Sequence, residues 1–293
     1  MTRHNFDLAP FEAWLSEKGR SEKTLSAYVS DLGVFAAFFE ELCGEGFSSE
    51  LVTSADLRKF QAHSQDSSPA TWNRRLVSLN LFFRFCMETK LITFNPMERA
   101  GLRHRKQQKA APRGLNRNDF ARLMRTVEQD LNAAKTDNQR RLAIRNRALF
   151  GALAYGALRV SEACELRRTN LLLGERKGTI RVEHGKGDKR GDVALGREGR
   201  LMMQDWLEIH QEEDVFEGIS TRQVERWLAD VGQRAGVYVT PHMLRHTAIR
   251  RVFVSSGFDL ALTQQFARHE RGEQTQRYAL PQEDEIAQVV ELM

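Results

Sequence analysis

The sequence predicts a mainly α-helical chain with a small β element, divided into two domains. Three observations lead to this prediction. The 293 residues are enough for two ordinary hydrophobic cores. Apolar residues recur at steps of three and four through most of the chain, which is the period of an amphipathic helix. A basic stretch interrupts that pattern, so we expect one domain at 1–100, a linker at 101–114 and a second domain at 115–293.

The first domain has the pattern of successive helices. Its longest apolar stripe comprises Leu25, Tyr28, Leu32, Phe35, Phe39 and Leu42. Thr53 and Asp56 have the spacing of a capping box, and Ser68-Pro69 predicts an N-cap followed by proline in the first turn of a helix. A second stripe comprises Leu76, Leu79, Phe83 and Cys86. We expect the aromatic side chains to form a core and not a surface on which bases stack.

Positive charge concentrates around the boundary between the domains. The whole chain has a formal net charge of +5 and a pI of about 9.2. Between Thr71 and Arg113, ten Lys and Arg stand against two acids, which gives a local charge of +8. Such a segment suits contact with a phosphate backbone, although a solvated basic face has the same composition. The candidate DNA-binding residues are Arg74, Arg75, Arg105, Lys106 and Lys109.

The second domain combines helices with one predicted hairpin. Leu115 restarts the helical pattern, and the apolar run from Ala148 to Leu158 predicts a buried helix. This run is too short for a membrane span, which needs about 20 residues. Residues 178–184 alternate as in a strand, glycines turn the chain, and residues 191–195 return, which places Lys186 at the hairpin turn.

Several functional classes find no support in the sequence. Cys43, Cys86 and Cys164 are isolated, which argues against a disulfide framework or a zinc site and fits a reducing cytoplasm. The N-terminus has no apolar signal core, so we expect a cytoplasmic protein without a membrane partner. No Walker Gly-x-x-x-x-Gly-Lys-Ser/Thr string is present, so nucleotide hydrolysis has no support.

Six side chains form an ordered set that suits attack on a DNA phosphodiester. They are Arg159, Lys186, His242, Arg245, His269 and Tyr278. Two guanidiniums can clamp non-bridging phosphate oxygens, and a lysine can protonate a leaving alkoxide. Two histidines can move protons or donate hydrogen bonds, while a tyrosine hydroxyl can attack phosphorus and hold the phosphoryl group.

Plainer alternatives exist for parts of this set. Arg159 and Glu162 have the spacing of a surface ion pair. Lys189 lies in the same turn as Lys186 and competes with it for the role of general acid. We expect His246 to pack or to cap away from the site.

Four strings carry a resemblance to a known family. They are Ala157-Leu158-Arg159-Val160-Ser161-Glu162, Gly185-Lys186-Gly187-Asp188-Lys189, His242-Met243-Leu244-Arg245-His246, and Arg268-His269 with Tyr278 nine residues after the histidine. In this order and spacing they resemble the tyrosine recombinase (phage integrase) family, most closely its Xer-like members. The resemblance extends from about residue 6 to the end of the chain.

The resemblance implies a fold and an activity. The fold is an N-terminal helical core-binding (SAM-like) domain joined to a mixed α/β tyrosine-recombinase catalytic domain. The activity is site-specific DNA recombination through a 3′-phosphotyrosyl intermediate and a Holliday junction, without ATP, an obligatory metal or another cofactor. The implied partners are a double-stranded DNA site and further copies of the chain in a homotetramer on two sites, with a second recombinase or accessory protein left open. A type IB topoisomerase-like enzyme and a DNA-binding regulator derived from a recombinase are the alternatives.

The resemblance also implies roles for individual residues. These are the phosphate clamp (Arg159 and Arg245), support of the clamp (Glu162), protonation of the leaving 5′ oxygen (Lys186), proton exchange with the nucleophile (His242), a hydrogen bond to the phosphate (His269) and nucleophilic attack (Tyr278). The target sequence stays open, as does the choice between dimer resolution, phage integration and transposon movement.

The residues around His269 depart from the family pattern. Arg268 stands where the family usually has glycine, and Thr275-Gln276 replace the usual small hydroxyl residues. The step from Arg245 to His269 is also about one residue longer, so we expect the geometry around His269 to differ.

The C-terminal tail carries acids at 283–285 and a narrow apolar stripe that includes Val289. A stripe this short must dock to stay helical. It would dock on its own domain or, as the resemblance implies, on a neighbouring protomer.

Overall fold

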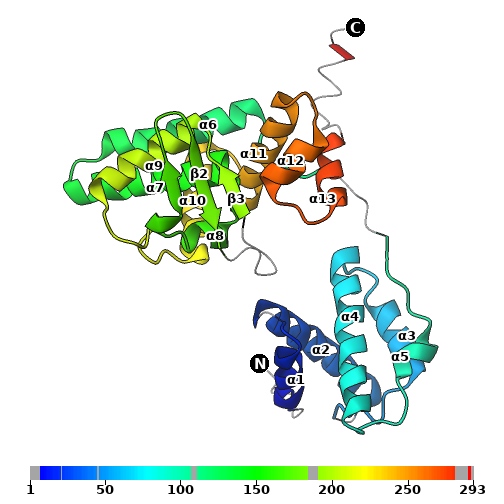
Figure 1. Ribbon diagram of the computed structural model, residues 1–293. Helices are drawn as coiled ribbons and strands as arrows, with labels where there is room; N and C mark the ends of the chain where they lie inside the picture. The colour runs from blue at the N-terminus through cyan, green and yellow to red at the C-terminus, as the bar shows by residue number, and fades with distance from the viewer. Residues whose placement is uncertain are drawn as a thin grey trace. The chain divides into compact units, whose positions relative to one another are not determined.

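The computed structural model describes residues 7–20, 22–44, 46–106, 111–183, 191–280 and 290–291. The chain divides into two compact units, Met1–Gln108 and Lys109–Met293. In its described residues the first unit is helical, and the second combines helices with one small sheet (Figure 1). The expected fold class, mainly α with a small β element, is confirmed.

The N-terminal unit consists of helices whose starts follow local signals. The described helices are α1 (Ala9–Glu17), α2 (Glu22–Cys43), α3 (Ser54–His63), α4 (Pro69–Glu88) and α5 (Pro96–Ala100). Thr53 and Asp56 form the predicted capping box ahead of α3. Ser68 accepts a hydrogen bond from the Thr71 backbone N–H at the start of α4, as predicted. Both signals act within one helical turn, which is why sequence reasoning finds them.

Aromatic side chains fill the core of the N-terminal unit. Phe35, Phe60, Phe82 and Phe83 are fully buried, as is Trp72. The rings of Phe35 and Phe60 meet edge to face, with centroids 5.0 Å apart, an arrangement that the ring quadrupoles favour. The expectation that these aromatic residues form a core is confirmed.

The predicted linker is bonded to the N-terminal unit near its start, and the residue that follows it is bonded within the C-terminal unit. The Asn73 side chain exchanges hydrogen bonds of 2.8 and 2.9 Å with the backbone of Arg105 in the N-terminal unit. The Leu115 backbone N–H donates to the Thr247 hydroxyl in the C-terminal unit at 2.8 Å. Residues 107–110, which include the candidate Lys109, lie outside the described residues.

The C-terminal unit contains both helices and strands. The described helices are α6 (Arg117–Ala133), α7 (Asp137–Tyr155), α8 (Val160–Cys164), α9 (Arg197–Ile209), α10 (Thr221–Ala235), α11 (Pro241–Ser255), α12 (Leu260–Ala267) and α13 (Gly272–Gln276), with 3-10 helices η1 (Arg168–Asn170) and η2 (Arg277–Ala279). The strands are β1 (Leu171–Leu173), β2 (Gly178–Val182) and β3 (Gly191–Ala194). They form an antiparallel sheet in the order β1-β2-β3.

The predicted hairpin corresponds to β2 and β3. Ile180 of β2 lies opposite Val193 of β3, and both side chains are buried. Strand β1 was not predicted. Its three consecutive leucines show no alternation, and their strand conformation depends on pairing with β2.

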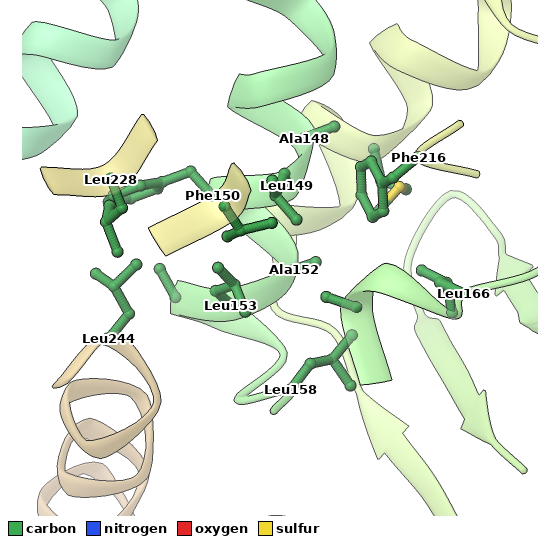
Figure 2. Packing of buried hydrophobic residues seen from close by; sticks show 14 of the residues in the cluster. Ala148, Leu149, Phe150, Ala152, Leu153, Leu158, Leu166, Phe216, Leu228 and Leu244 are labelled. Atoms are coloured by element: carbon green, nitrogen blue, oxygen red, sulfur yellow. The ribbon is translucent and has the colours of Figure 1, made fainter. Parts of the chain in front are cut away.

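Helix α7 lies at the centre of the C-terminal core. Its residues from Ala148 to Ala154 are all buried. Figure 2 shows Leu228 of α10 and Leu244 of α11 directed toward the side chains of α7. The predicted buried helix is confirmed, but it ends at Tyr155 and does not continue to Leu158.

The last three α-helices within residues 191–280 follow one another closely along the chain. α11, α12 and α13 lie side by side in Figure 1. None of the helices in the described ranges is both long and apolar enough to cross a bilayer. The tail helix expected at 283–293 lies outside the described residues, apart from Val290 and Glu291.

Candidate active site

Five of the six predicted catalytic residues lie on elements of the C-terminal unit that meet around α11. Arg159 is the N-cap of α8, and His242 and Arg245 lie near the start of α11, as the spacing predicts. His269 follows the C-cap of α12, and Tyr278 is the middle residue of η2. Residues far apart in the sequence are thus brought together by the packing of these short elements.

The sixth predicted residue, Lys186, lies in the sequence between β2 and β3. Lys186 and its alternative, Lys189, both fall within residues 184–190, which lie outside the described residues. The strands on either side of these residues pair antiparallel, as the predicted hairpin requires. The assignment of the general acid to Lys186 therefore stays a prediction.

A buried carboxylate holds the Arg159 side chain. α7 ends at Tyr155 and α8 begins at Val160, so Arg159 and Glu162 do not continue the preceding helix. Glu162 Oε2 accepts a hydrogen bond from the Arg159 backbone N–H at 2.8 Å, and Oε1 accepts one from the guanidinium at 2.6 Å. The Glu162 side chain is only 2% exposed, which is incompatible with a surface ion pair.

A second guanidinium reaches the same carboxylate. Arg268 Nη2 donates to Glu162 Oε2 at 2.6 Å. Burial by itself would raise the pKa of Glu162, but the hydrogen bond and charge of Arg268, followed by the contacts from Arg159, hold that pKa below its usual value. Glu162 is therefore ionised at neutral pH and links the two arginines.

Arg245 is a buried charged residue of the site, with 2% of its surface exposed. Its guanidinium donates to the backbone carbonyls of Ala157 and Ala267. Burial, followed by the charge of Arg159, lowers the pKa of Arg245 to about 10, which leaves it charged at neutral pH. The two carbonyls fix the guanidinium plane, so its remaining N–H groups have a defined direction.

Tyr278 lies inside the protein. It is 2% exposed and packs in a small apolar cluster with side chains of α11 and α12. Its hydroxyl forms a hydrogen bond with Nδ1 of His246. The expectation that His246 points away from the site is therefore wrong. Burial raises the pKa of the Tyr278 hydroxyl, although nearby arginines oppose this shift, so the phenol is protonated at neutral pH.

The rings of His246 and His269 lie beside Tyr278, and a third ring, that of His242, packs against His246. The His269 ring lies 6.1 Å from that of Tyr278, and its Nδ1 pairs with the Thr275 hydroxyl at 2.9 Å. The His242 ring packs against the His246 ring at 4.3 Å. Burial lowers the pKa of all three imidazoles, to about 3 for His246 and about 4 for His269. Nearby arginines add to this effect, and for His246 the neighbouring His242 comes before them. All three are neutral at neutral pH.

This arrangement can bind and attack a phosphodiester. Arg159 and Arg245 supply two fixed cations for the non-bridging oxygens of a phosphate. The neutral histidines can accept or share a proton. Tyr278 supplies a hydroxyl that becomes a nucleophile once it loses its proton.

Two candidate DNA-binding arginines of α4 make contacts within the N-terminal unit. Arg74 donates two hydrogen bonds, of 2.7 and 2.9 Å, to the buried Asp31. Arg75 donates to the Ser67 hydroxyl at 2.9 Å and lies 3.8 Å from Asp31. Each guanidinium is thus already engaged, although Arg74 is still half exposed and keeps surface for a phosphate.

Arg105 is engaged more completely than the α4 arginines. Its guanidinium donates to the backbone carbonyls of Ser64, Gln65 and Ser67 at 2.9 to 3.1 Å. It also lies over the Trp72 ring, 5.0 Å from the centroid. The neighbouring Lys106 is exposed.

Sequence reasoning missed two residues of the site, His246 and Arg268. His246 lies four residues after His242, a spacing that places both side chains on one face of a helix. This spacing indicates that His246 lies near the same site as His242. The sequence indicates Arg268 only as a departure from the family pattern and predicts no contact for its side chain. Its contact with Glu162 joins residues 106 positions apart, and no local pattern predicts such a contact.

Two family models match the chain over the two units. The model "Phage integrase family" matches residues 115–285. The model "Phage integrase, N-terminal SAM-like domain" matches residues 8–90. Together they span most of the chain and follow its division into two units.

Similar proteins and structures are found along nearly the full length. A protein of Chromobacterium violaceum named tyrosine recombinase XerC is 31% identical over 288 residues, which cover 94% of this chain and 90% of that relative. The crystal structure of XerH site-specific recombinase bound to difH substrate, a pre-cleavage complex, is 18% identical and covers 91% of this chain and 78% of its own, with a TM-score of 0.68. A lambda integrase tetramer bound to a Holliday junction is also 18% identical, covers 90% and 76%, and has a TM-score of 0.68. At these identities the two structures show a shared fold.

Proposed function

The chain belongs to the phage integrase family, and from this premise we propose that it is a site-specific DNA recombinase with Tyr278 as its nucleophile. One observation carries the assignment of the nucleophile. The Tyr278 hydroxyl lies among neutral histidines, within the same cluster of elements that fixes the guanidiniums of Arg159 and Arg245. A hydroxyl beside proton acceptors and phosphate-binding cations is the combination that phosphoryl transfer to tyrosine requires.

The proposed reaction exchanges one phosphodiester for another. The Tyr278 hydroxyl gives its proton to His242 in the family-based assignment, and its oxygen attacks the scissile phosphorus. The bond to the 5′ oxygen breaks as the 3′-phosphotyrosyl link forms. The 5′ oxygen leaves with a proton, which Lys186 supplies in the family-based assignment. The 5′ hydroxyl of a partner strand then gives its proton to Lys186 and attacks the phosphotyrosyl link. The departing Tyr278 oxygen takes its proton back from His242. Each step makes one phosphate ester as it breaks another, so no nucleotide triphosphate is consumed.

The two arginines act most strongly during attack. Charge on the non-bridging oxygens is redistributed as the phosphorus becomes five-coordinate, and fixed donors stabilise that state without rearranging. The carbonyl contacts of Arg245 and the carboxylate contact of Arg159 hold these donors in place before DNA arrives. We assign the hydrogen bond to the phosphate to His269, whose ring orientation is set by Thr275.

The proposed partner is duplex DNA carrying a recombination site. The similar solved structures hold DNA, one as a pre-cleavage complex and one as a tetramer on a Holliday junction. By analogy, four copies of this chain would assemble on two sites and pass through the same type of junction. Such an enzyme acts where chromosomal or plasmid DNA lies, so we place it in the cytoplasm.

The two alternative activities have weaker support. A topoisomerase-like enzyme would reseal its own strand, and a binding regulator would not cleave at all. The similarity to a named recombinase covers 94% of the chain, including the N-terminal unit, and all six predicted catalytic positions carry the family residue types. Both facts favour strand exchange.

A nicked suicide DNA substrate tests the proposal. Because the short 5′ product diffuses away, cleavage leaves the protein covalently attached to DNA. The unmodified chain should form this adduct, while Tyr278→Phe should bind DNA with similar affinity and form none. Tyr238→Phe is the matched control, because Tyr238 is 71% exposed in the same unit and should behave like the unmodified chain. An adduct with Tyr278→Phe would mean that another residue is the nucleophile.

A further inference from the structure

Arg268 lies directly before His269 and has no counterpart in the family pattern, where glycine is usual. We propose that Arg268 is a positioning residue of the phosphate clamp, which acts through Glu162 on Arg159. This inference rests on the proposed function and adds a residue to its site. Four observations support it: the contacts of Glu162, the charge balance, the backbone conformation of Arg268 and the packing of its side chain.

The Glu162 carboxylate is held from two sides. One oxygen accepts a hydrogen bond from the Arg159 guanidinium at 2.6 Å. The other accepts from Arg268 Nη2 at 2.6 Å and from the Arg159 backbone N–H at 2.8 Å. Rotation of the carboxylate would break these bonds. Arg268 therefore restricts the group that sets the direction of the Arg159 side chain.

The charge balance of the clamp also depends on Arg268. Arg159 and Glu162 alone would form a neutral pair, and a neutral pair attracts a phosphodiester anion weakly. Arg268 adds one positive charge beside the carboxylate. Among the described residues, Glu162 is the one carboxylate that lies within 4 Å of an Arg268 nitrogen. With Arg268 present, the three groups carry a net charge of +1, so Arg159 remains attractive to phosphate.

The backbone at Arg268 does not by itself favour arginine. Arg268 has a φ of 53°, in the left-handed region that glycine adopts without strain. Glycine at this position would close α12 as well and with less strain. The arginine side chain must therefore contribute something that offsets this conformational cost, and the bond to Glu162 is the visible contribution.

The path of the Arg268 side chain depends on a glycine in the sheet. A Cβ atom placed on Gly191, the first residue of β3, would lie 3.0 Å from Arg268 Cδ. The bare backbone at Gly191 thus leaves room for the arginine stem to reach Glu162. Only 14% of the Arg268 side chain is exposed, so the guanidinium is enclosed where it meets the carboxylate.

A double-variant cycle separates this role from direct contact with DNA. The variants are Arg268→Met, Glu162→Gln and the two combined, and the measurements are single-turnover cleavage of the suicide substrate, DNA affinity and thermal unfolding. Arg268→Met should slow cleavage by about 10- to 100-fold, the usual effect of removing a group that orients a catalytic residue. DNA affinity should change by less than about threefold, because the clamp matters most in the transition state. Arg268→Lys should recover part of the rate.

The combined variant decides between the two roles. If Arg268 acts through Glu162, adding Arg268→Met to Glu162→Gln should slow cleavage by less than about threefold further. Equal losses in both backgrounds would mean that Arg268 contacts the phosphate itself, and the inference would be overturned. Arg226→Met, which removes the same charge from an exposed position on α10, should cleave normally.

A substitute variant and a separate test of the proposed function complete the experiment. Should Arg268→Met unfold, Arg268→Gly replaces it, since glycine suits the φ of 53°. An Arg268→Gly protein that cleaves as fast as the unmodified chain would overturn the inference. The proposed function is tested separately by adduct formation of the unmodified chain. Cleavage by the Arg268 variants at the normal rate would therefore overturn the role of Arg268 but not the proposed function.

Discussion

At the scale of single residues, the proton of Tyr278 is the central problem. Burial raises the pKa of the hydroxyl, so attack requires a group that accepts its proton. His246 touches that hydroxyl, but burial and neighbouring charges lower its pKa to about 3, which makes it a weak acceptor. We infer that His246 orients the ring of Tyr278. Proton exchange stays with His242 as the family-based assignment has it, and the ring of His242 packs against that of His246.

Substitutions at His246 and His242 should separate orientation from proton transfer. His246→Asn retains a hydrogen-bonding group near the position of Nδ1, so single-turnover cleavage should stay within about tenfold of normal, whereas His246→Ala should lose more. His242→Ala should slow cleavage by about 10² to 10⁴, the range for loss of a general base. If His246→Asn is as slow as His246→Ala, while both proteins bind DNA, proton transfer belongs to His246.

At the scale of elements, Arg105 connects the linker to the end of α3. The carbonyls of Ser64, Gln65 and Ser67 follow the last turn of that helix, and the Arg105 guanidinium satisfies all three. A cation at a helix C-terminus is also favoured by the helix dipole. The sequence predicts that Arg105 binds DNA because it reveals the charge of this residue. It does not reveal the hydrogen bonds with these carbonyls, which form only in the folded chain.

Arg105 and Lys106 should therefore behave differently although they are neighbours. Arg105→Ala should lower the free energy of unfolding by about 1–3 kcal/mol, because it leaves backbone carbonyls without donors. Lys106→Ala should leave stability unchanged and reduce the slope of log affinity against log salt by about one. Urea unfolding and DNA binding at several salt concentrations measure both effects. A reduced salt slope for Arg105→Ala without a loss of stability would show that Arg105 binds phosphate.

The sequence between β2 and β3 contains a matched pair of lysines, Lys186 and Lys189. Lys186→Ala should slow cleavage by about 10² to 10⁴, because the 5′ oxygen then leaves without a proton donor. A substrate with sulfur in place of that oxygen should restore the rate, since a thiolate leaves readily as an anion. Lys189→Ala should need no such rescue. The opposite result would exchange the roles of the two lysines.

At the scale of the whole molecule, locally encoded features were predictable. The capping box of Thr53 and Asp56 and the burial of the helix through Ala148 depend on neighbours in the sequence, and the structure has both. Strand β1 was missed because its conformation comes from pairing with β2. The preferences of residues 171–173 alone do not predict strand β1.

In the candidate site too, contacts between residues far apart in the sequence could not be predicted. The order of Arg159, Arg245 and Tyr278 identified the residue types and the family. The contact between His246 and Tyr278 instead depends on how η2 packs against α11, across 32 residues of sequence. Sequence spacing cannot fix such a contact, because it is decided by the packing of two helices.

The same packing makes the stability of the C-terminal unit depend on pH. His246 and His269 have pKa values lowered to about 3 and about 4 in the folded chain, against about 6.5 when unfolded. Above pH 6.5 both states are neutral, and the contribution to stability is complete. As the pH falls below 6.5, the unfolded chain takes up protons first. Each histidine then lowers the free energy of unfolding by up to about 1.4 kcal/mol per pH unit.

Urea unfolding of the full chain between about pH 7 and pH 5 measures this loss. In that range His246→Asn should flatten the decline of the free energy of unfolding, because asparagine takes up no proton in either state. The matched control is His104→Asn, which removes an exposed histidine of the N-terminal unit and should leave the decline unchanged. An identical decline for His246→Asn and the unmodified chain would mean that His246 titrates alike in the folded and unfolded states. Its burial against Tyr278 would then not shift its pKa.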